Sequence, residues 1–367
     1  MEKQHLTYFK IENFKRFDSF EMSNLGQFNL IVGDNNVGKT SVLEALLFDE
    51  DRIEYLFNLY STLYIRGLLN KYPEDTRQYG TLKEIWLYIF RELQKPLNIE
   101  VKDSSDFAKK IKLELIEGKD LVERDKNFIA QQVLLNQSPE LWLRFYFQDE
   151  YSGVFGRYNE EAIEFRKKSN YVVSKYISFN VGYLDIHLSS YFQNINSSKK
   201  KRVEFENNLK LIINNLEEVR PHKVFNREIL GVVLKNDQEI YPIARFGDGV
   251  VKIMRILLGI FSVDGERVMI DEIDAGIHYS KLKAFWKAIF LMCHNRQVQL
   301  FATTHSLECQ QAFIEALQDE DMQQFQQDAR NITMMEDKDG QVKAVTYDFE
   351  QFEYALNIGF NTRGGKQ

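Results

Sequence analysis

Cysteine, proline and long apolar runs are all scarce in this chain. Its 367 residues include two cysteines and five prolines. Cys293 and Cys309 are too few for a disulfide framework and too far apart for a zinc knuckle, so we expect two buried thiols in a cytoplasmic protein. Because prolines are so few, the domain boundaries are only weakly marked.

The chain also lacks segments that would direct it to a membrane. The best candidate for a span, Ile253 to Val263, is short and carries Arg255, and the N-terminus has no apolar core of a signal peptide. A bilayer span needs about 20 apolar residues. Hydrophobic residues still make up 44% of the composition, which is ample for a core. We therefore expect a soluble globular protein with no membrane partner.

Acidic side chains exceed basic ones, which gives a formal net charge of −7. Such a surface does not attract nucleic acid as a whole, so a DNA contact would need a local basic patch. One basic run, Lys199 to Arg202, begins a helical stretch that glutamates interrupt. A solvated helix face is the favoured interpretation, and DNA binding is the alternative.

One segment matches the phosphate-binding P-loop pattern G-x-x-x-x-G-K-[ST] at every fixed position. It consists of Gly33, Asp34, Asn35, Asn36, Val37, Gly38, Lys39 and Thr40, and Ser41 follows. The run before it has the composition of a buried strand, and the residues after it have helical spacing. In that order, loop amides and the positive end of the helix surround phosphates. The context favours nucleotide binding over a glycine-rich turn without a ligand.

A second apolar strand, Arg267 to Ile270, is followed by the acids Asp271 and Glu272. Adjacent strand residues point to opposite sides, so both carboxylates can serve one site only if the strand ends there. We assign Asp271 and Thr40 to Mg²⁺, and Glu272 to polarising the attacking water. A strand that merely enters a turn is the alternative, and the P-loop makes it less favourable.

A third apolar strand, Val298 to Ala302, leads into the sequence Thr-Thr-His-Ser, in which the histidine is His305. Ligands of doubly wound sheets bind beyond the carboxyl ends of the strands. We therefore expect the P-loop, the acid pair and His305 to meet in one pocket, with His305 reaching the γ-phosphate. His278 is interpreted as a structural residue.

Hydrophobic periodicity predicts the remaining elements. Strands are expected at Leu6 to Ile11, Phe28 to Val32, Leu230 to Leu234 and Glu239 to Ile243, and helices over about 50–95 and 186–227. Alternation at Ile111, Leu113 and Leu115, and again at Leu141, Leu143, Phe145 and Phe147, predicts an antiparallel sheet.

The order of the three motifs resembles that of the ABC-type ATPases of the SMC, Rad50 and RecF group, and the chain is most similar to the OLD-like ATPases. The resemblance is carried by the P-loop and by Phe9 to Phe17, Asp271 to His278, the Thr-Thr-His-Ser strand, Asp339-Gly340 and Gly359 to Arg363. It implies that Lys15 and Arg16 approach the nucleotide and that Asp274, Ala275 and Gly276 form a D-loop.

This resemblance also implies the fold and the assembly. We expect an α/β fold, that of an ABC-type P-loop ATPase, with a mixed central sheet, an antiparallel β subdomain and helical insertions. ATP, held with Mg²⁺, would be sandwiched between the P-loop of one subunit and a signature loop of another, in a homodimer or higher homo-oligomer. A Q-loop residue should end a strand that faces the magnesium, and Tyr176 to Asn180 offers Asn180.

The segment that matches the signature loop is Phe246 to Val250, with Gly247, Asp248 and Gly249 as the contacting residues. It departs from the usual Leu-Ser-Gly-Gly-Gln because Gly247 replaces the serine, so only backbone amides at a helix N-terminus remain to meet the phosphate. The sandwiched arrangement therefore lacks a hydroxyl contact to the γ-phosphate at this position. A tight turn with a helix cap is the alternative interpretation.

The expected division of the chain follows the motifs. It places an N-terminal part of the ATPase core at 1–49, a helical and antiparallel-sheet insertion at 50–185, a short helical arm at 186–228, and a C-terminal part of the core at 229–367.

The function is expected from what accompanies the ATPase. About 60 residues follow His305, too few for the Toprim nuclease that OLD-like proteins often carry. Stand-alone ATPases of this build resemble sensor or scaffold subunits of anti-phage systems, which control a separate effector such as a nuclease or toxin. The alternatives are a RecF-like DNA-repair clamp and a nucleotide-binding structural module with negligible turnover.

Overall fold

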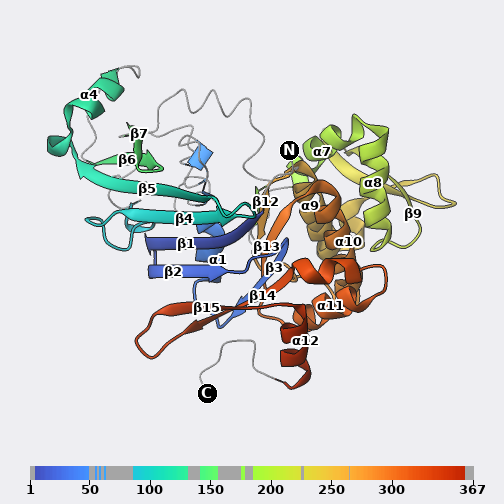
Figure 1. Ribbon diagram of the computed structural model, residues 1–367. Coiled ribbons are helices and arrows are strands. Elements are labelled where there is room, and N and C mark those ends of the chain that lie inside the picture. Colours follow the sequence, from blue (N-terminus) through green and yellow to red (C-terminus); the bar gives the residue numbers. More distant parts are fainter. Residues whose placement is uncertain are drawn as a thin grey trace.

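The computed structural model describes residues 5–48, 86–130, 141–155, 175–177, 185–224, 227–263 and 265–359, together with Glu54, Tyr55, Asn58 and Thr62. Asn180, the chain end from Phe360 and most of the helix expected over 50–95 lie outside these residues. The described elements form three layers, with an antiparallel sheet and a helical layer on opposite sides of a central sheet (Figure 1).

The central sheet has the strand order β15-β14-β3-β13-β12-β8. Its strands are β3 (Phe28–Gly33), β8 (Tyr176–Ile177), β12 (Arg267–Ile270), β13 (Gln299–Thr303), β14 (Ala329–Glu336) and β15 (Val342–Tyr347). All neighbouring pairs are parallel except β14 and β15, so the sheet is mixed. The carboxyl ends of β3, β13 and β12 therefore lie side by side, which confirms the expected meeting of the three motif strands.

The second sheet is antiparallel and has the order β2-β1-β4-β5-β6-β7. It comprises β1 (Leu6–Phe14), β2 (Phe17–Ser23), β4 (Leu97–Asp103), β5 (Ala108–Glu117), β6 (Leu141–Phe147) and β7 (Glu150–Phe155). The two alternating segments predicted from the sequence pair directly, with Ile111 opposite Phe147 and Leu113 opposite Phe145. Sequence periodicity did not predict β2, nor that β1 belongs to this sheet.

The described helices pack against the two sheets, one of them between the sheets and most of them on the opposite face of the central sheet. They are α1 (Lys39–Ala45), α4 (Glu123–Ala130), α7 (Asp185–Asn196), α8 (Lys199–Lys210), α9 (Asp248–Ser262), α10 (Tyr279–Arg296), α11 (Leu307–Gln318) and α12 (Phe349–Asn357). Single 3-10 turns occur at Gly118–Asp120, Ile243–Phe246 and Gln323–Asp328.

The helical prediction for 186–227 is correct for α7 and α8 but wrong beyond them. Residues 216–224 form strand β9 (Leu216–Val224), which pairs with β10 (Arg227–Leu234), and β11 (Ile240–Pro242) completes a three-stranded sheet. Pro221 lacks a backbone N–H and would break a helix interior, so pairing with β10 is the better outcome for this segment. The helices α7 and α8 bury Phe192 and Phe205 in the main core.

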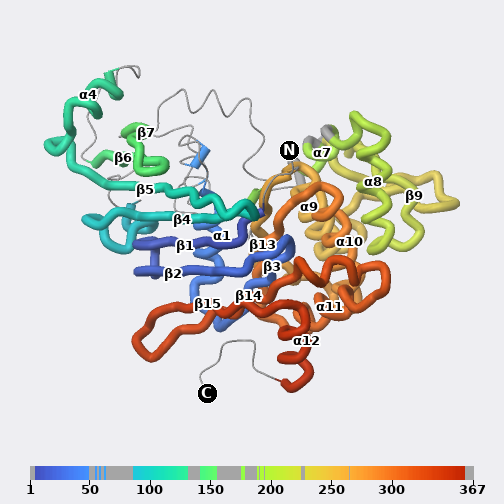
Figure 2. Tube along the Cα trace, in the orientation of Figure 1, coloured from blue at the N-terminus to red at the C-terminus, as the bar shows by residue number. Residues whose placement is uncertain are grey.

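Alternation along the central strands separates two hydrophobic cores. Leu30 and Val268 belong to the core shared with α9, α10 and α11, whereas Ile31, Met269 and Phe301 belong to the core shared with α1 and the antiparallel sheet. Figure 2 follows the same arrangement along the chain, with the blue N-terminal strands on one side and the orange helices on the other. Strands of a parallel sheet that is buried on both faces have continuous apolar sequences, as these strands do.

Two expectations from composition concern cysteines and membranes. Cys293 and Cys309 are buried free thiols, as expected. Throughout the described ranges, no helix is both long and apolar enough to cross a bilayer.

Candidate nucleotide-binding site

The P-loop connects β3 to α1 and requires glycine at both of its fixed glycine positions. Gly33 and Gly38 have φ angles of 146° and 103°, a region that side chains strongly disfavour. A Cβ on Gly38 would lie 2.7 Å from the Phe17 ring, and one on Gly33 would lie 2.5 Å from the Met334 carbonyl oxygen. The backbone therefore follows a path open only to glycine, as a loop that wraps phosphate needs.

Lys39 begins α1, and its ammonium lies within the loop. Its Nζ donates to the carbonyl oxygens of Gly33 at 2.8 Å and Asp34 at 2.9 Å. Burial lowers the pKa of Lys39, while the carboxylates of Asp271, Asp34 and Glu272 oppose that shift. Asp271 and Glu272 therefore lie near enough to the Lys39 ammonium to act on it electrostatically.

The turn between β1 and β2 places Arg16 against the P-loop. The Arg16 guanidinium donates to the Asn36 carbonyl oxygen and pairs with Glu336, and its side chain lies beside Gly38. Lys15 points elsewhere, because its ammonium pairs with the buried carboxylate of Glu44 in α1. Of the two basic residues implied by the resemblance, Arg16 is the one that contacts the loop.

Thr40 and the acid pair meet at the ends of β3 and β12. The hydroxyl of Thr40 donates to Asp271 Oδ1 at 3.3 Å, and the buried hydroxyl of Thr303 donates to the same oxygen at 2.6 Å. Thr303 Oγ1 also accepts the backbone N–H of Glu272 at 2.8 Å. β12 ends at Ile270, and Glu272 has a left-handed φ of 46°. The strand therefore ends before the acid pair, as one shared site requires.

The end of β13 also holds the segment that resembles a D-loop. Thr304 Oγ1 donates to Asp274 Oδ1 at 2.7 Å, and the backbone N–H of Ser306 donates to Thr304 Oγ1 at 3.0 Å. The Ser306 side chain caps α11. Between these anchored residues, His305 is exposed at the carboxyl edge of the sheet. The strand thus fixes the backbone on both sides of His305 and leaves its ring accessible.

The segment that resembles a signature loop packs against the same D-loop. Gly247 caps the N-terminus of α9 with a φ of 88°, and Gly249 lies so close that a Cβ would be 2.5 Å from the Gly276 carbonyl oxygen. Lys252, one turn further along α9, donates to the carbonyl oxygens of Glu272 and Ala275 at 2.5 and 3.0 Å. Burial lowers the pKa of Lys252 to about 8, against the attraction of nearby carboxylates.

The structure also separates structural residues from candidate functional ones. His278 caps α10 and accepts the Ser280 backbone N–H on Nδ1, in line with the structural interpretation. Asn180 falls in the part of the chain that is not described, so its Q-loop role stays a prediction. Sequence reasoning missed Thr303 and Lys252 as positioning groups. The hydroxyl at the end of a motif strand could have indicated Thr303, but no local signal indicates Lys252.

The donor set suits a magnesium–nucleotide complex. Among the described residues, no cluster of three histidine, cysteine, aspartate or glutamate side chains could hold a metal by itself. Mg²⁺ usually takes one or two carboxylates and completes its shell with water and substrate phosphates. One threonine hydroxyl beside one aspartate, adjoining a glycine loop, fits that requirement.

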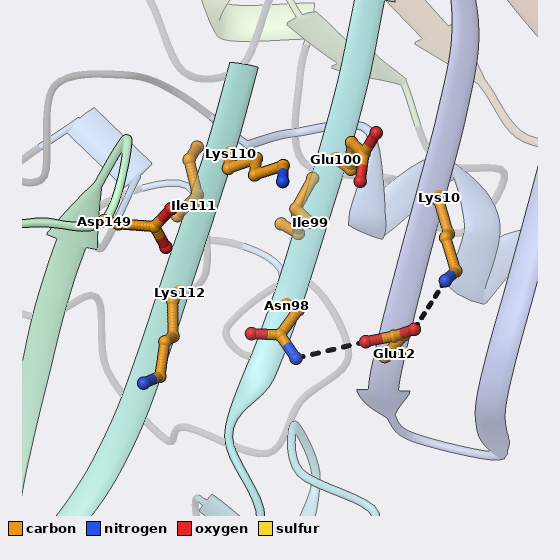
Figure 3. A pocket seen from close by; sticks show the side chains of 9 residues that line it. All are labelled: Lys10, Glu12, Asn98, Ile99, Glu100, Lys110, Ile111, Lys112 and Asp149. Atoms are coloured by element: carbon orange, nitrogen blue, oxygen red, sulfur yellow. Dashed lines mark hydrogen bonds and ion pairs between the residues drawn. The ribbon is translucent and has the colours of Figure 1, made fainter. Parts of the chain in front are cut away.

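A pocket of about 240 Å³ lies elsewhere, on the antiparallel sheet (Figure 3). Its lining residues come from β1, β4, β5 and the β6–β7 turn, and include three lysines and three acids. Glu12 pairs with Lys10 at 2.6 Å and accepts from Asn98 at 3.1 Å. The three lysines and three acids of the pocket therefore balance in charge, and its lining has no excess of positive charge to bind a triphosphate.

Comparison with known proteins adds two kinds of likeness. Residues 28–308 match the family model described as "AAA domain, putative AbiEii toxin, Type IV TA system". A Helicobacter pylori protein described as "ATP/GTP phosphatase" is 24% identical over 337 residues, covering 84% of this chain and 86% of that protein.

Among solved structures, the Smc head domain from Pyrococcus furiosus, with an extended coiled coil and bound to the C-terminal domain of ScpA, is similar with a TM-score of 0.50. The match has 10% sequence identity and covers 96% of this chain and 99% of that one. At this identity the likeness concerns the fold, and it agrees with the expected ABC-type α/β architecture.

Proposed function

Because the chain belongs to the AAA domain family that its residues 28–308 match, we propose that this ATPase is an oligomeric switch controlling a separate effector protein in anti-phage defence. The ATPase part of this proposal rests on the hydrogen-bonded group in which Thr40 and Thr303 both donate to Asp271, beside the P-loop lysine. The family description names a putative toxin of a type IV toxin–antitoxin system, which supports a role linked to toxicity.

The residues of the site divide the work of ATP hydrolysis. Bound Mg²⁺ would neutralise charge on the β and γ phosphates, with Thr40 and Asp271 as its protein ligands. Lys39 and the loop amides bind the phosphates, and Arg16 stabilises the loop through its hydrogen bond to the Asn36 carbonyl oxygen. Glu272 accepts the proton of the attacking water, a role that typically contributes ~10²–10⁴-fold in rate. His305 contacts the γ-phosphate from the end of β13.

A second copy of the chain would complete the site. Gly247, Asp248 and Gly276 are all exposed, so the signature and D-loop segments are accessible to a partner subunit. The exposed N-terminus of α9 offers backbone N–H groups to a phosphate held by the partner's P-loop. ATP binding would then favour association, and hydrolysis would release it.

The test compares wild type with Glu272→Gln, using Glu315→Gln as the control because Glu315 is an exposed glutamate on α11. We expect Glu272→Gln to bind ATP but to lose at least about 100-fold in turnover, and to shift to a dimeric or larger mass when ATP is added. The control should match wild type. Masses that stay monomeric in both nucleotide states would refute the sandwich arrangement.

The effector is tested by co-expression with the product of the adjacent gene. We expect that product to be toxic when alone, and its toxicity to depend on whether the ATPase partner carries Glu272→Gln. Equal growth with wild-type and Glu272→Gln partners would contradict the switch.

One observation favours the DNA-clamp alternative. Lys199, Lys200 and Lys201 are all exposed at the start of α8. Turnover that rises with DNA and falls steeply with salt would support that function instead. Negligible turnover that is unchanged in Glu272→Gln would support a nucleotide-binding module without catalysis.

A further inference from the structure

Lys252 connects the signature helix to the turn that carries Glu272. It lies on α9, which runs beside β12 in the helical layer (Figure 1). Its Nζ donates to the carbonyl oxygen of Glu272 itself at 2.5 Å and to that of Ala275 at 3.0 Å. A lysine ammonium has three donors and no acceptor, so it is suited to gathering carbonyl oxygens from a single turn.

A second contact joins the same two segments. The α-carbon of Gly249 approaches the D-loop so closely that any side chain would meet the Gly276 carbonyl oxygen. Gly249 lies one helical turn before Lys252, so both contacts are made by the first turns of α9. Movement of that end of α9 must therefore move the turn at 271–277.

The opposite side of the turn is fixed by β13. Thr303 holds the backbone N–H of Glu272, and Thr304 holds the carboxylate of Asp274. Glu272 also adopts a left-handed backbone conformation, which persists in a residue other than glycine only when neighbouring groups enforce it. The amide of Glu272 is held by the sheet, and its carbonyl is held by the signature helix.

We propose that Lys252 is a positioning residue for ATP hydrolysis, which couples the position of the signature helix to the orientation of Glu272. The inference rests on the proposed role of Glu272 as general base. A partner's nucleotide that engages the Gly247–Gly249 segment would act on Glu272 through Lys252 and the Gly249 contact. Hydrolysis in one site would thereby depend on whether the signature segment of the same subunit is engaged.

The test uses Lys252→Met, which keeps most of the length of the side chain and removes its donors. The matched control is Lys281→Met, because the Lys281 ammonium donates to a backbone carbonyl outside the turn, that of Ile212, at 3.0 Å. For each protein, kcat, KM, the equilibrium Kd for ATP and the Tm are measured. Lys252→Arg retains charge and donors, and serves as the rescue variant.

We expect Lys252→Met to lower kcat about 10–100-fold, since a displacement near 1 Å of a catalytic group can cost ~100-fold. KM and the Kd for ATP should change less than about threefold, because the P-loop is untouched. Lys252→Arg should regain part of the rate, and Lys281→Met should match wild type. Hydrogen exchange at the amides of 272–277 should rise in Lys252→Met alone.

Several outcomes would overturn the inference. One is a kcat within about twofold of wild type in Lys252→Met. Another is a fall in both kcat and ATP affinity that is the same in the two methionine variants. If Lys252→Met does not fold, Gly249→Ala decides, and normal turnover in that variant refutes the coupling. A wild-type protein without turnover would overturn the proposed function as well, whereas normal wild-type turnover beside an unaffected Lys252→Met overturns the inference alone.

Discussion

Thr303 provides the sharpest test of the site, because a single buried hydroxyl holds both members of the acid pair. Its side chain is fully buried, donates to Asp271 Oδ1 at 2.6 Å and accepts the Glu272 backbone N–H at 2.8 Å. The substitution Thr303→Val replaces that hydroxyl with a methyl group of similar volume. It removes two hydrogen bonds and creates almost no cavity.

The magnitude follows from those two bonds. A buried polar group left without its partner costs about 1–3 kcal/mol, so the two bonds together predict a loss of about 3 kcal/mol in unfolding free energy. With ~2.1 cal/mol/K of unfolding entropy per residue over 367 residues, that loss lowers Tm by about 4 °C in a cooperative transition. Mutation of a group that positions a metal ligand typically lowers metal affinity or activity ~10–100-fold.

The assay is steady-state ATP hydrolysis as a function of Mg²⁺, read beside the thermal transition. Thr333→Val is the matched control, because Thr333 is equally buried in the same sheet but donates to Asn331 Oδ1 at 2.8 Å. We expect both variants to lose stability and only Thr303→Val to need more Mg²⁺ and to turn over at least about tenfold more slowly. Equal kcat and Mg²⁺ dependence in the two variants would refute the role of Thr303.

Three further predictions concern the strand before the acid pair, the antiparallel sheet and the P-loop. Arg267 donates to the carbonyl oxygens of Leu46 and Phe48, just after α1, and its guanidinium lies 4.0 Å from the centroid of the Phe48 ring. Arg267→Met should therefore lower the free energy of unfolding by about 2–3 kcal/mol, seen as a lower midpoint in urea; an unchanged midpoint contradicts this. Burial would raise the pKa of Asp125, but hydrogen bonds from Arg144 and the Val122 backbone lower it. Ionised Asp125 therefore stabilises the fold above the pKa of an unfolded aspartate, and this stabilisation is lost as pH falls through its lower folded pKa. Asp125→Asn should lower the free energy of unfolding by about 2–3 kcal/mol at neutral pH, and the Tm difference from wild type should shrink in acid. A Tm difference that does not change with pH excludes the ion pair as its source. Gly38→Ala would place a methyl group 2.7 Å from the Phe17 ring at a positive φ, so equilibrium titration should show ATP binding at least about tenfold weaker, and an unaltered Kd would show that the loop tolerates the shift.

Local sequence was sufficient to predict an element wherever consecutive residues carry the whole pattern that defines it. The P-loop, the strand that ends in Asp271 and the strand before His305 each combine an apolar run with polar residues at its end, and the structure places all three strands side by side. The antiparallel sheet that contains β5 and β6 also followed from their alternation. These features depend on a period of two and on the shared direction of parallel strands.

Local patterns failed where pairing partners are distant or where a propensity is overridden. Strand β9 was expected as helix because its polar composition hides the alternation, yet Pro221 and the hairpin with β10 decide its conformation. The partner of Lys15 was also missed, since Glu44 is a buried carboxylate on a helix and nothing in the sequence marks it as the counter-ion.

The sequence by itself determined that this chain has a P-loop, an acid pair and a histidine at the ends of three buried strands, because each motif is written in consecutive residues. Only the tertiary structure decided that Thr303 holds both acids and that Lys252 fastens the signature helix to Glu272. These contacts join residues 20, 31 and 32 positions apart in sequence, and hydrogen bonds of that span are set by how strands and helices pack.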